Sequence, residues 1–131
     1  MKDIEKGGKK IRQFNSGATR DSNDGKFDYE GFNHPLVDEA YGRYMHKHRK
    51  QADGKLRDSD NWQKLFGPKH CAVCIKSLMR HLLDLRFLHR GYKRTDEKSG
   101  LEVTEEEALC AIIFNANAYL FKILTDDLKG K

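Results

Sequence analysis

The sequence predicts an all-α fold: a compact bundle of three main helices preceded by a flexible N-terminal arm. Apolar residues recur at helical spacing in three separate segments, which is typical of amphipathic helices. No segment of useful length alternates apolar and polar residues as a half-buried strand would. With 131 residues and no internal repeat, the chain fits one such domain.

Residues 1–26 are predicted to form a flexible basic arm, and residues 27–131 a helical domain. The arm is rich in Lys, Gly, Asp, Ser and Asn and has few apolar anchors, so it cannot offset the entropy lost on ordering. The stretch that follows contains Phe27, Tyr29 and Phe32 and is expected to pack on the domain.

The first helix is expected to run from Pro35 to near Lys50. Proline suits the first helical turn, and apolar residues then recur at helical spacing as far as Met45. The next segment, residues 51–61, is polar and contains an Asp-Gly pair, which favours a turn. The sequence therefore predicts a loop there.

The second and third helices have recognisable ends. The second is expected from about Lys69 to Arg90, because Gly91 is suited to stop a helix. A charged loop then leads to Thr104, which forms a capping box with the glutamate three positions later. The third helix is expected to begin there and to reach about Asp126.

Composition narrows the range of partners. Charged residues make up 34% of the chain, and the formal net charge of +5 favours anionic partners. Basic residues are dispersed among acidic ones, which does not favour nucleic acid. The uncharged run from Ala108 to Phe121 is too short to cross a bilayer, and the N-terminus lacks the apolar stretch of a signal peptide. These features predict a cytoplasmic protein without a membrane partner.

The three cysteines, Cys71, Cys74 and Cys110, lie in helix-like apolar patterns. Their odd number and placement favour reduced, buried thiols. The Cys-x-x-Cys pair follows His70, but structural zinc needs four ligands and no second pair has suitable spacing. We therefore predict no metal or other cofactor.

The most informative polar feature lies on the second helix. Ser77, Arg80, His81 and Asp84 have offsets of zero, three, four and seven residues and share one helical face. Arg80 could grip a phosphate through two donors, while Asp84 could orient His81 or neutralise Arg80. The alternative is a solvated ion pair beside an ordinary half-buried histidine.

Two further positions join this stripe as candidates for ligand binding. A loop beside the predicted core combines charges, an amide and the only tryptophan, and loops on rigid scaffolds often bind ligands: its residues are Arg57, Asp58, Asp60, Asn61 and Trp62. Asn115 falls on an apolar face of the third helix and needs hydrogen-bond partners. The alternatives are that Trp62 only anchors the loop and that Asn115 only bridges to another helix.

Ordered short motifs run through most of the chain, from about Ser16 to Leu124. They are residues 16–21 (SGATRD), 25–26 (GK), 44–45 (YM), 48–49 (HR), 60–62 (DNW), 77 (S), 80–81 (RH), 89–91 (HRG), 108–111 (ALCA) and 114–115 (FN). In this order they resemble the phage-encoded dATP/dGTP diphosphohydrolase, N-terminal domain family. The resemblance implies a phage or prophage origin and a relation to the all-α nucleoside triphosphate pyrophosphohydrolases, which bind magnesium through helix carboxylates.

The chain departs from this family where metal ligands are expected. Family members carry acidic residues after the second helix and a His-rich start to the last helix, whereas here residues 89–94 read HRGYKR and residues 107–111 read EALCA. Cations in place of carboxylates remove metal ligands but still attract phosphate. The departure implies that the chain retains nucleotide binding but has lost the hydrolysis reaction.

The leading hypothesis is therefore a phage-type protein that binds or sequesters a phosphate-bearing nucleotide, with a host immune signal as a candidate ligand in an anti-defence role. We expect Arg80 to bind phosphate, Trp62 to stack on the base and Asn115 to contact the base or ribose. Ser77, His81 and Asn61 are the other expected contacts. Arg20 of the arm is expected to close over the ligand.

Two alternatives remain open. One is a magnesium-dependent dATP/dGTP diphosphohydrolase, with Asp84 and Glu105 as catalytic candidates and Asp60 as a third metal ligand, although this acidic set is incomplete. The other is an inhibitor that binds a host protein through the basic arm. In each case three helices cover little apolar surface, so we expect a homo-oligomer with aromatic positions of the first or third helix at its interface.

Overall fold

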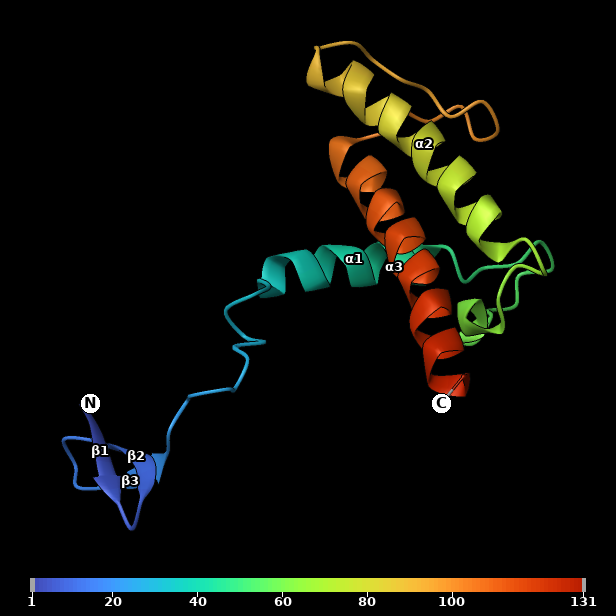
Figure 1. The fold of residues 1–131 in the computed structure, drawn as a ribbon. Helices are drawn as coiled ribbons and strands as arrows, with labels where there is room; N and C mark the ends of the chain where they lie inside the picture. Colours follow the sequence, from blue (N-terminus) through green and yellow to red (C-terminus); the bar gives the residue numbers. More distant parts are fainter. Residues whose placement is uncertain (1, 131) are drawn as a thin grey trace. The chain divides into compact units, whose positions relative to one another are not determined.

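The computed structural model describes residues 2–130 and divides into two compact units, Met1–His34 and Pro35–Lys131. The first unit contains strands β1 (Lys2–Lys6), β2 (Lys9–Gln13) and β3 (Thr19–Asp21). The second contains helices α1 (Pro35–Lys47), α2 (His70–His89) and α3 (Glu105–Lys129) and the short 3₁₀ helix η1 (Asn61–Lys64). Figure 1 shows both units.

The all-α prediction is wrong, because the first unit is a three-stranded antiparallel sheet in the order β1-β2-β3. The segment predicted to be a flexible arm is thus built into strands. Gly7 and Gly8 both have positive φ, 61° and 78°, which is the geometry of a two-residue hairpin turn. They place Lys6 opposite Lys9 and pair Ile4 with Ile11.

Charged cross-strand pairs explain why this sheet escaped a search for apolar alternation. Asp3 lies opposite Arg12, and Glu5 lies opposite Lys10. Opposite charges at facing positions stabilise a strand pair as apolar pairs do. On the other side of β2, the side-chain Nε of Arg12 donates a hydrogen bond to the backbone oxygen of Asp21 at 2.9 Å. The structure is therefore mixed, with helices and a sheet.

Helix α1 begins at Pro35 as predicted but ends at Lys47, earlier than expected. Two ion pairs join it to the start of α3: Arg43 lies 3.6 Å from Glu106, and Lys47 lies 3.4 Å from Glu107. The predicted loop follows, and its tip is Gly54 with a φ of 84°. These contacts fix the C-terminal end of α1 beside α3.

Helices α2 and α3 lie side by side and run in opposite directions (Figure 1). Gly91, with a φ of 85°, ends α2 as predicted. Thr104 caps α3 by accepting a hydrogen bond from the backbone N–H of Glu107 at 3.1 Å, which confirms Thr104 as the N-cap, and its hydroxyl also contacts the Glu107 carboxylate at 3.3 Å. In the connecting loop, Arg94 lies 3.0 Å from Asp84 and covers the ring of Phe87.

Small side chains form the buried contact between α2 and α3. The buried hydrophobic residues in the described part of the chain are Cys74, Ala108, Cys110, Ala111 and Ala118. Small residues let two helices approach closely, but they remove little apolar area from water. All three cysteines are free thiols; Cys74 and Cys110 are buried as predicted, whereas Cys71 is only partly buried.

The buried His70 ties three segments together. Its Nδ1 accepts a hydrogen bond from the backbone N–H of Phe66 at 3.0 Å, and its Nε2 donates to the backbone oxygen of Ala118 at 2.9 Å. One nitrogen accepts and the other donates, so the ring is the neutral Nε2–H tautomer. These bonds fasten the segment after η1 to α2 and α3, and they account for His70 without a metal.

Helix α3 is long and apolar enough to cross a membrane when only its length and composition are considered. The core helices of soluble proteins meet the same condition, and α3 packs against α1, α2 and η1 here. The predicted cytoplasmic location stays a prediction.

Candidate functional site

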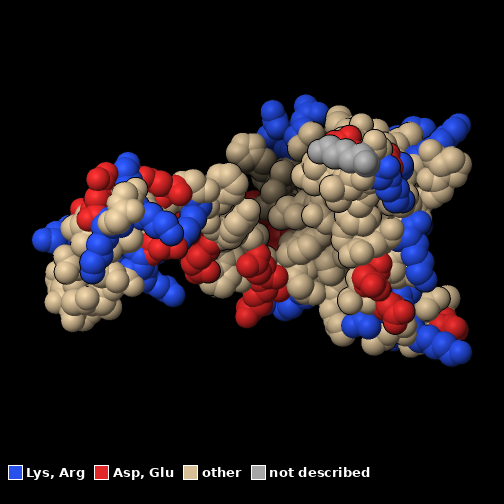
Figure 2. All heavy atoms as spheres, turned by 60° about the horizontal axis from the view of Figure 1, so that its bottom comes forward, with Lys and Arg blue, Asp and Glu red and all other residues tan. Residues whose placement is uncertain are grey.

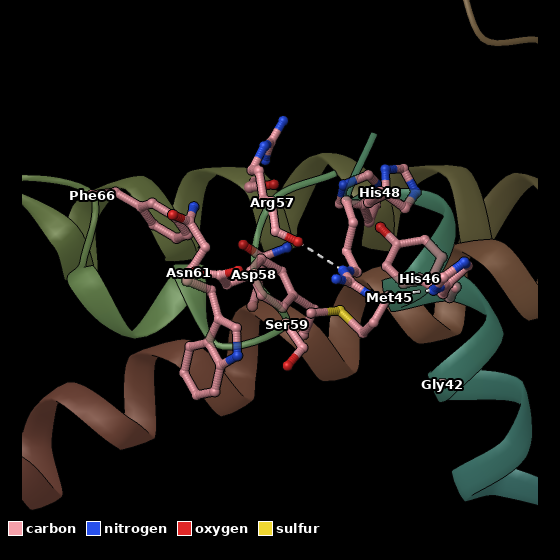
Figure 3. A pocket seen from close by; sticks show the side chains of 16 residues that line it. Gly42, Met45, His46, His48, Arg57, Asp58, Ser59, Asn61 and Phe66 are labelled. Carbon is pink, nitrogen blue, oxygen red and sulfur yellow. Dashed lines mark hydrogen bonds between the residues drawn. The ribbon is translucent and has the colours of Figure 1, made fainter. Parts of the chain in front are cut away.

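The helical unit contains a cavity of about 650 Å³ where α1 and the following loop meet η1, α2 and α3. We call it the pocket, and Figure 3 shows its lining side chains. They belong to Gly42, Tyr44, Met45, His46, His48, Arg49, Arg57, Asp58, Ser59, Asn61, Trp62, Phe66, Ser77, His81, Phe114 and Asn115.

One part of the pocket is cationic because the loop after α1 folds back on itself. The backbone N–H of Arg57 donates to the backbone oxygen of Arg49 at 2.8 Å, and the Nε of Arg49 donates to the backbone oxygen of Arg57 at 2.7 Å. A guanidinium nitrogen of Arg49 also lies 3.5 Å from Nδ1 of His46. Within residues 2–130, no hydrogen bond or ion pair occupies the guanidinium of Arg57.

Two histidines in the pocket, His48 and His81, have lowered pKa values. Burial is the main cause for His48, whose ring lies 4.4 Å from that of Tyr44, and the charge of Lys47 lowers its pKa further. Burial also lowers the pKa of His81, against the opposing effect of Asp84. Both rings are therefore neutral at pH 7, and each can donate one hydrogen bond and accept another.

The other part of the pocket is aromatic. The ring of Trp62 meets those of Phe114 and Phe121 edge-on, with centroids 6.3 and 5.0 Å apart. Phe66 stacks on His70 at 4.9 Å, yet it remains 40% exposed. Burial raises the pKa of Tyr44 to about 12, so its hydroxyl stays protonated and can donate a hydrogen bond. The pocket thus offers ring surfaces as well as polar groups.

The backbone is strained between Trp62 and Phe66. Leu65 has a φ of 70° and a ψ of 162°, a combination that residues other than glycine rarely adopt. The turn ends η1 and directs the chain so that the N–H of Phe66 reaches His70. Such a conformation costs about 1–3 kcal/mol and persists only when its surroundings hold it.

Most of the predicted ligand-binding residues line this one cavity. They are Asn61, Trp62, Ser77, His81 and Asn115. The amide nitrogen of the buried Asn115 donates to the backbone oxygen of Ala111 at 2.8 Å, within its own helix rather than to another one. The roles assigned to these residues stay predictions.

Two predicted ligand contacts are not among the residues that line the pocket. Arg80 is exposed on α2 and is not among the lining residues, although its neighbours Ser77 and His81 are. Arg20 lies on β3, opposite Arg12 of β2, in the first unit. The pocket itself is built entirely from the second unit.

The three carboxylates considered as magnesium ligands are not gathered into one site. Asp84 pairs with Arg94, while Asp60 and Glu105 are exposed at the starts of η1 and α3. Over residues 2–130, no group of three or more His, Cys, Asp or Glu side chains is arranged to hold a metal ion.

The residues expected to contact a ligand did not include several side chains that line the pocket. These are Tyr44, His46, His48, Arg49, Arg57 and Phe66. The run of basic residues at positions 46–50 (HKHRK) was the available indication, because such a run can attract phosphate. The N–H of His48 still bonds to the oxygen of Tyr44, four residues earlier, at 3.3 Å, so His48 continues the face of α1 that carries Tyr44. Arg49 lies in the turn that follows.

Comparison of the chain with protein families, with curated proteins and with solved structures gives no match. The resemblance to the phage dATP/dGTP diphosphohydrolase, N-terminal domain family therefore stays a prediction.

Proposed function

We propose that the helical unit binds a phosphate-bearing nucleotide in the pocket and holds it without hydrolysis. This proposal rests on one observation: guanidinium groups, imidazole groups and exposed aromatic rings all line the same cavity. A nucleotide needs both, because its phosphate is anionic and its base is a flat aromatic ring. A volume of about 650 Å³ is typical of small-molecule sites.

Arg57 is the residue that we assign to the phosphate. Its guanidinium is exposed and carries five N–H donors in a planar fork that matches a phosphate. The hydrogen bonds between Arg49 and Arg57 hold the loop that presents it. His48 and His81 add neutral donors beside this group.

The base is assigned to the aromatic part of the pocket, near Phe66 and Trp62. Phe66 has one ring face against His70 and remains 40% exposed, so it offers apolar surface to a ligand. The side-chain oxygen of Asn115 can accept a hydrogen bond from a base or ribose.

Binding without hydrolysis is favoured because the Asp84 carboxylate is already paired with Arg94. A magnesium-dependent diphosphohydrolase needs converging carboxylates, and Asp84 is neutralised by Arg94 at 3.0 Å. We infer that the protein sequesters its ligand. The resemblance to a phage family supports a role in removing a nucleotide signal of the host defence.

A thermal-shift screen of mono-, di-, tri- and cyclic nucleotides, each with and without magnesium, tests the proposal. A ligand that binds only the folded protein raises its melting temperature. We expect a shift that does not depend on magnesium, with the nucleotide recovered intact by chromatography. A magnesium-dependent shift with consumption of the nucleotide would establish the enzyme instead. No shift with any nucleotide would overturn the proposal and favour a host protein as partner.

A further inference from the structure

The chain exposes more surface than a folded monomer of its size. Its accessible surface is 10,708 Å². A compact protein of 15.2 kDa exposes about 7,100 Å² by the usual dependence of area on mass. Even when the two units are treated as separate bodies, the same relation gives about 8,400 Å² in total. Roughly 2,300 Å² therefore remains above the expected area of a monomer.

Exposed apolar side chains are found on each of the three helices, and four of those on α3 share one side of the helix. Leu109, Ile113, Leu120 and Leu124 are 44%, 38%, 53% and 52% exposed. At 100° per residue, these four positions fall within about 60° of one another around the helix axis. We call them the α3 stripe. Most residues of α3 that are buried against the rest of the unit lie on the opposite side, among them Ala111 and Ala118, whereas the buried Cys110 borders the stripe.

The α3 stripe is symmetric about its own centre. Leu109 and Leu124 are equally far from the midpoint between Ala116 and Asn117, and so are Ile113 and Leu120. A two-fold axis at this midpoint would place each leucine or isoleucine against the apolar side chain of its counterpart in a second copy. The small Ala116 would lie at the crossing point, where two helices approach most closely.

We propose that the α3 stripe is the interface of a homodimer, in which α3 packs antiparallel against α3 of a second copy. Antiparallel packing also brings the acidic start of α3, with Glu105 and Glu106, toward the basic Lys129 at the end of the other copy. The dimer would supply the large apolar contacts that are missing from the monomer, whose buried hydrophobic residues are Ala and Cys only over residues 2–130. Such contacts stabilise an obligate dimer.

A membrane is the other surface that could cover such a stripe, and the charges argue against it. Although α3 meets the length and composition condition for a membrane span, its uncharged run ends before Lys122, which pairs with Asp126. Both ends of α3 carry exposed carboxylates. In Figure 2, uncharged side chains cover a broad area of the helical unit and charged ones of both signs lie around it.

Light scattering during gel filtration of the full chain at micromolar concentration tests the dimer. We expect about 30 kDa for the wild type, twice the chain mass of 15.2 kDa. The double variant Ile113→Glu, Leu120→Glu should elute as a monomer because it places four carboxylates in the interface. The matched control is Leu101→Glu, which alters a 70% exposed leucine outside the α3 stripe and should remain dimeric.

A crosslinking experiment keeps the test decisive if the double variant fails to fold. Ala116→Cys lies at the proposed axis and should give a disulfide-linked dimer on mild oxidation, whereas Ser99→Cys in the loop before α3 should not. A wild-type protein that stays at 15.2 kDa up to 100 micromolar, or that floats with vesicles of neutral phospholipid, overturns the proposal. Nucleotide binding does not enter either readout, so the dimer and the pocket are tested separately.

Discussion

Arg57 owes its proposed role to the backbone around it. The loop brings Arg49 and Arg57 together through two hydrogen bonds, and neither bond uses the guanidinium of Arg57. A charged donor left available beside an aromatic cavity is suited to an anionic ligand.

Replacing Arg57 should therefore weaken nucleotide binding. We expect Arg57→Ala to raise the dissociation constant by about tenfold, the usual effect of losing a charge-assisted hydrogen bond. Isothermal titration calorimetry measures this directly. Lys76→Ala, which removes an exposed cation of α2 outside the pocket, should bind as the wild type does. Equal losses in the two variants would point to a general charge effect rather than to a phosphate contact.

The two histidines with lowered pKa values predict a pH dependence. They are neutral at pH 7 and gain protons only below their ordinary pKa of about 6.5, so the pocket becomes more cationic as the pH falls. Binding of a cyclic nucleotide, whose phosphodiester keeps one charge, should tighten between pH 7.5 and 5. Titration of His48→Gln, His81→Gln should give a flatter profile, and an unchanged profile would exclude both rings.

The same groups affect stability in the opposite direction. The unfolded chain takes up protons near pH 6.5, before the folded state does, so the free energy of unfolding falls as the pH drops through this value. Measurements of ligand affinity and of stability must therefore be made separately at each pH.

At the scale of single residues, the sequence could identify part of the site. Helical spacing placed Ser77 and His81 on one face, and the structure puts both in the pocket. Arg80 belongs to the same periodic pattern but is exposed, whereas its neighbour His81 is partly buried. Helical periodicity alone cannot distinguish two adjacent positions at the edge of a face. The sequence placed Arg57 in a loop suited to ligand binding but could not assign it to the phosphate, because its position depends on how that loop folds.

Among the helices, the end of α2 and the start of α3 were predicted best from sequence, because capping and helix-stopping residues act locally. Gly91 and the Thr104 capping box lie where the structure ends α2 and begins α3. The sheet was missed because its strands are mainly charged, although Gly7-Gly8 is a hairpin pattern that could have been recognised.

The capping box gives a prediction for α3 as an element. Thr104→Ala removes the acceptor for the N–H of Glu107 and should lower the free energy of unfolding by about 1 kcal/mol. Urea denaturation followed by circular dichroism provides the measurement. Thr104→Ser keeps a hydroxyl at this position and should retain most of the stability. If both substitutions have the same effect, the hydroxyl is not the stabilising group.

For the whole molecule, the division into two units bears on two hypotheses: that Arg20 contacts the nucleotide, and that the N-terminal segment binds a host protein. All lining residues of the pocket lie between Gly42 and Asn115, whereas Arg20 belongs to the first unit. We expect Arg20→Ala to change nucleotide affinity by less than twofold. A larger loss, measured by calorimetry, would restore Arg20 as a ligand contact as the sequence suggested. A host protein that is captured by the full chain but not after removal of residues 1–34 would favour the inhibitor hypothesis.

The predicted homo-oligomer followed from a general shortage of covered surface, but the interface could not be located from sequence. Aromatic positions of the first or third helix were predicted there, and both the oligomer and its interface stay predictions; of these aromatic residues, Phe114 and Phe121 contact Trp62 within the unit. The exposed residues of α3 are aliphatic, and which side of the helix they occupy depends on how α1 and α2 pack against it.

Trp62 has a further consequence, which is spectroscopic. It is the only tryptophan of the chain, and it lies in the lining of the pocket with its ring against two phenylalanines. The indole fluorescence of the unmodified protein therefore comes entirely from this site. Each occupant of the cavity can be followed through emission intensity and wavelength, without a label and in the native chain.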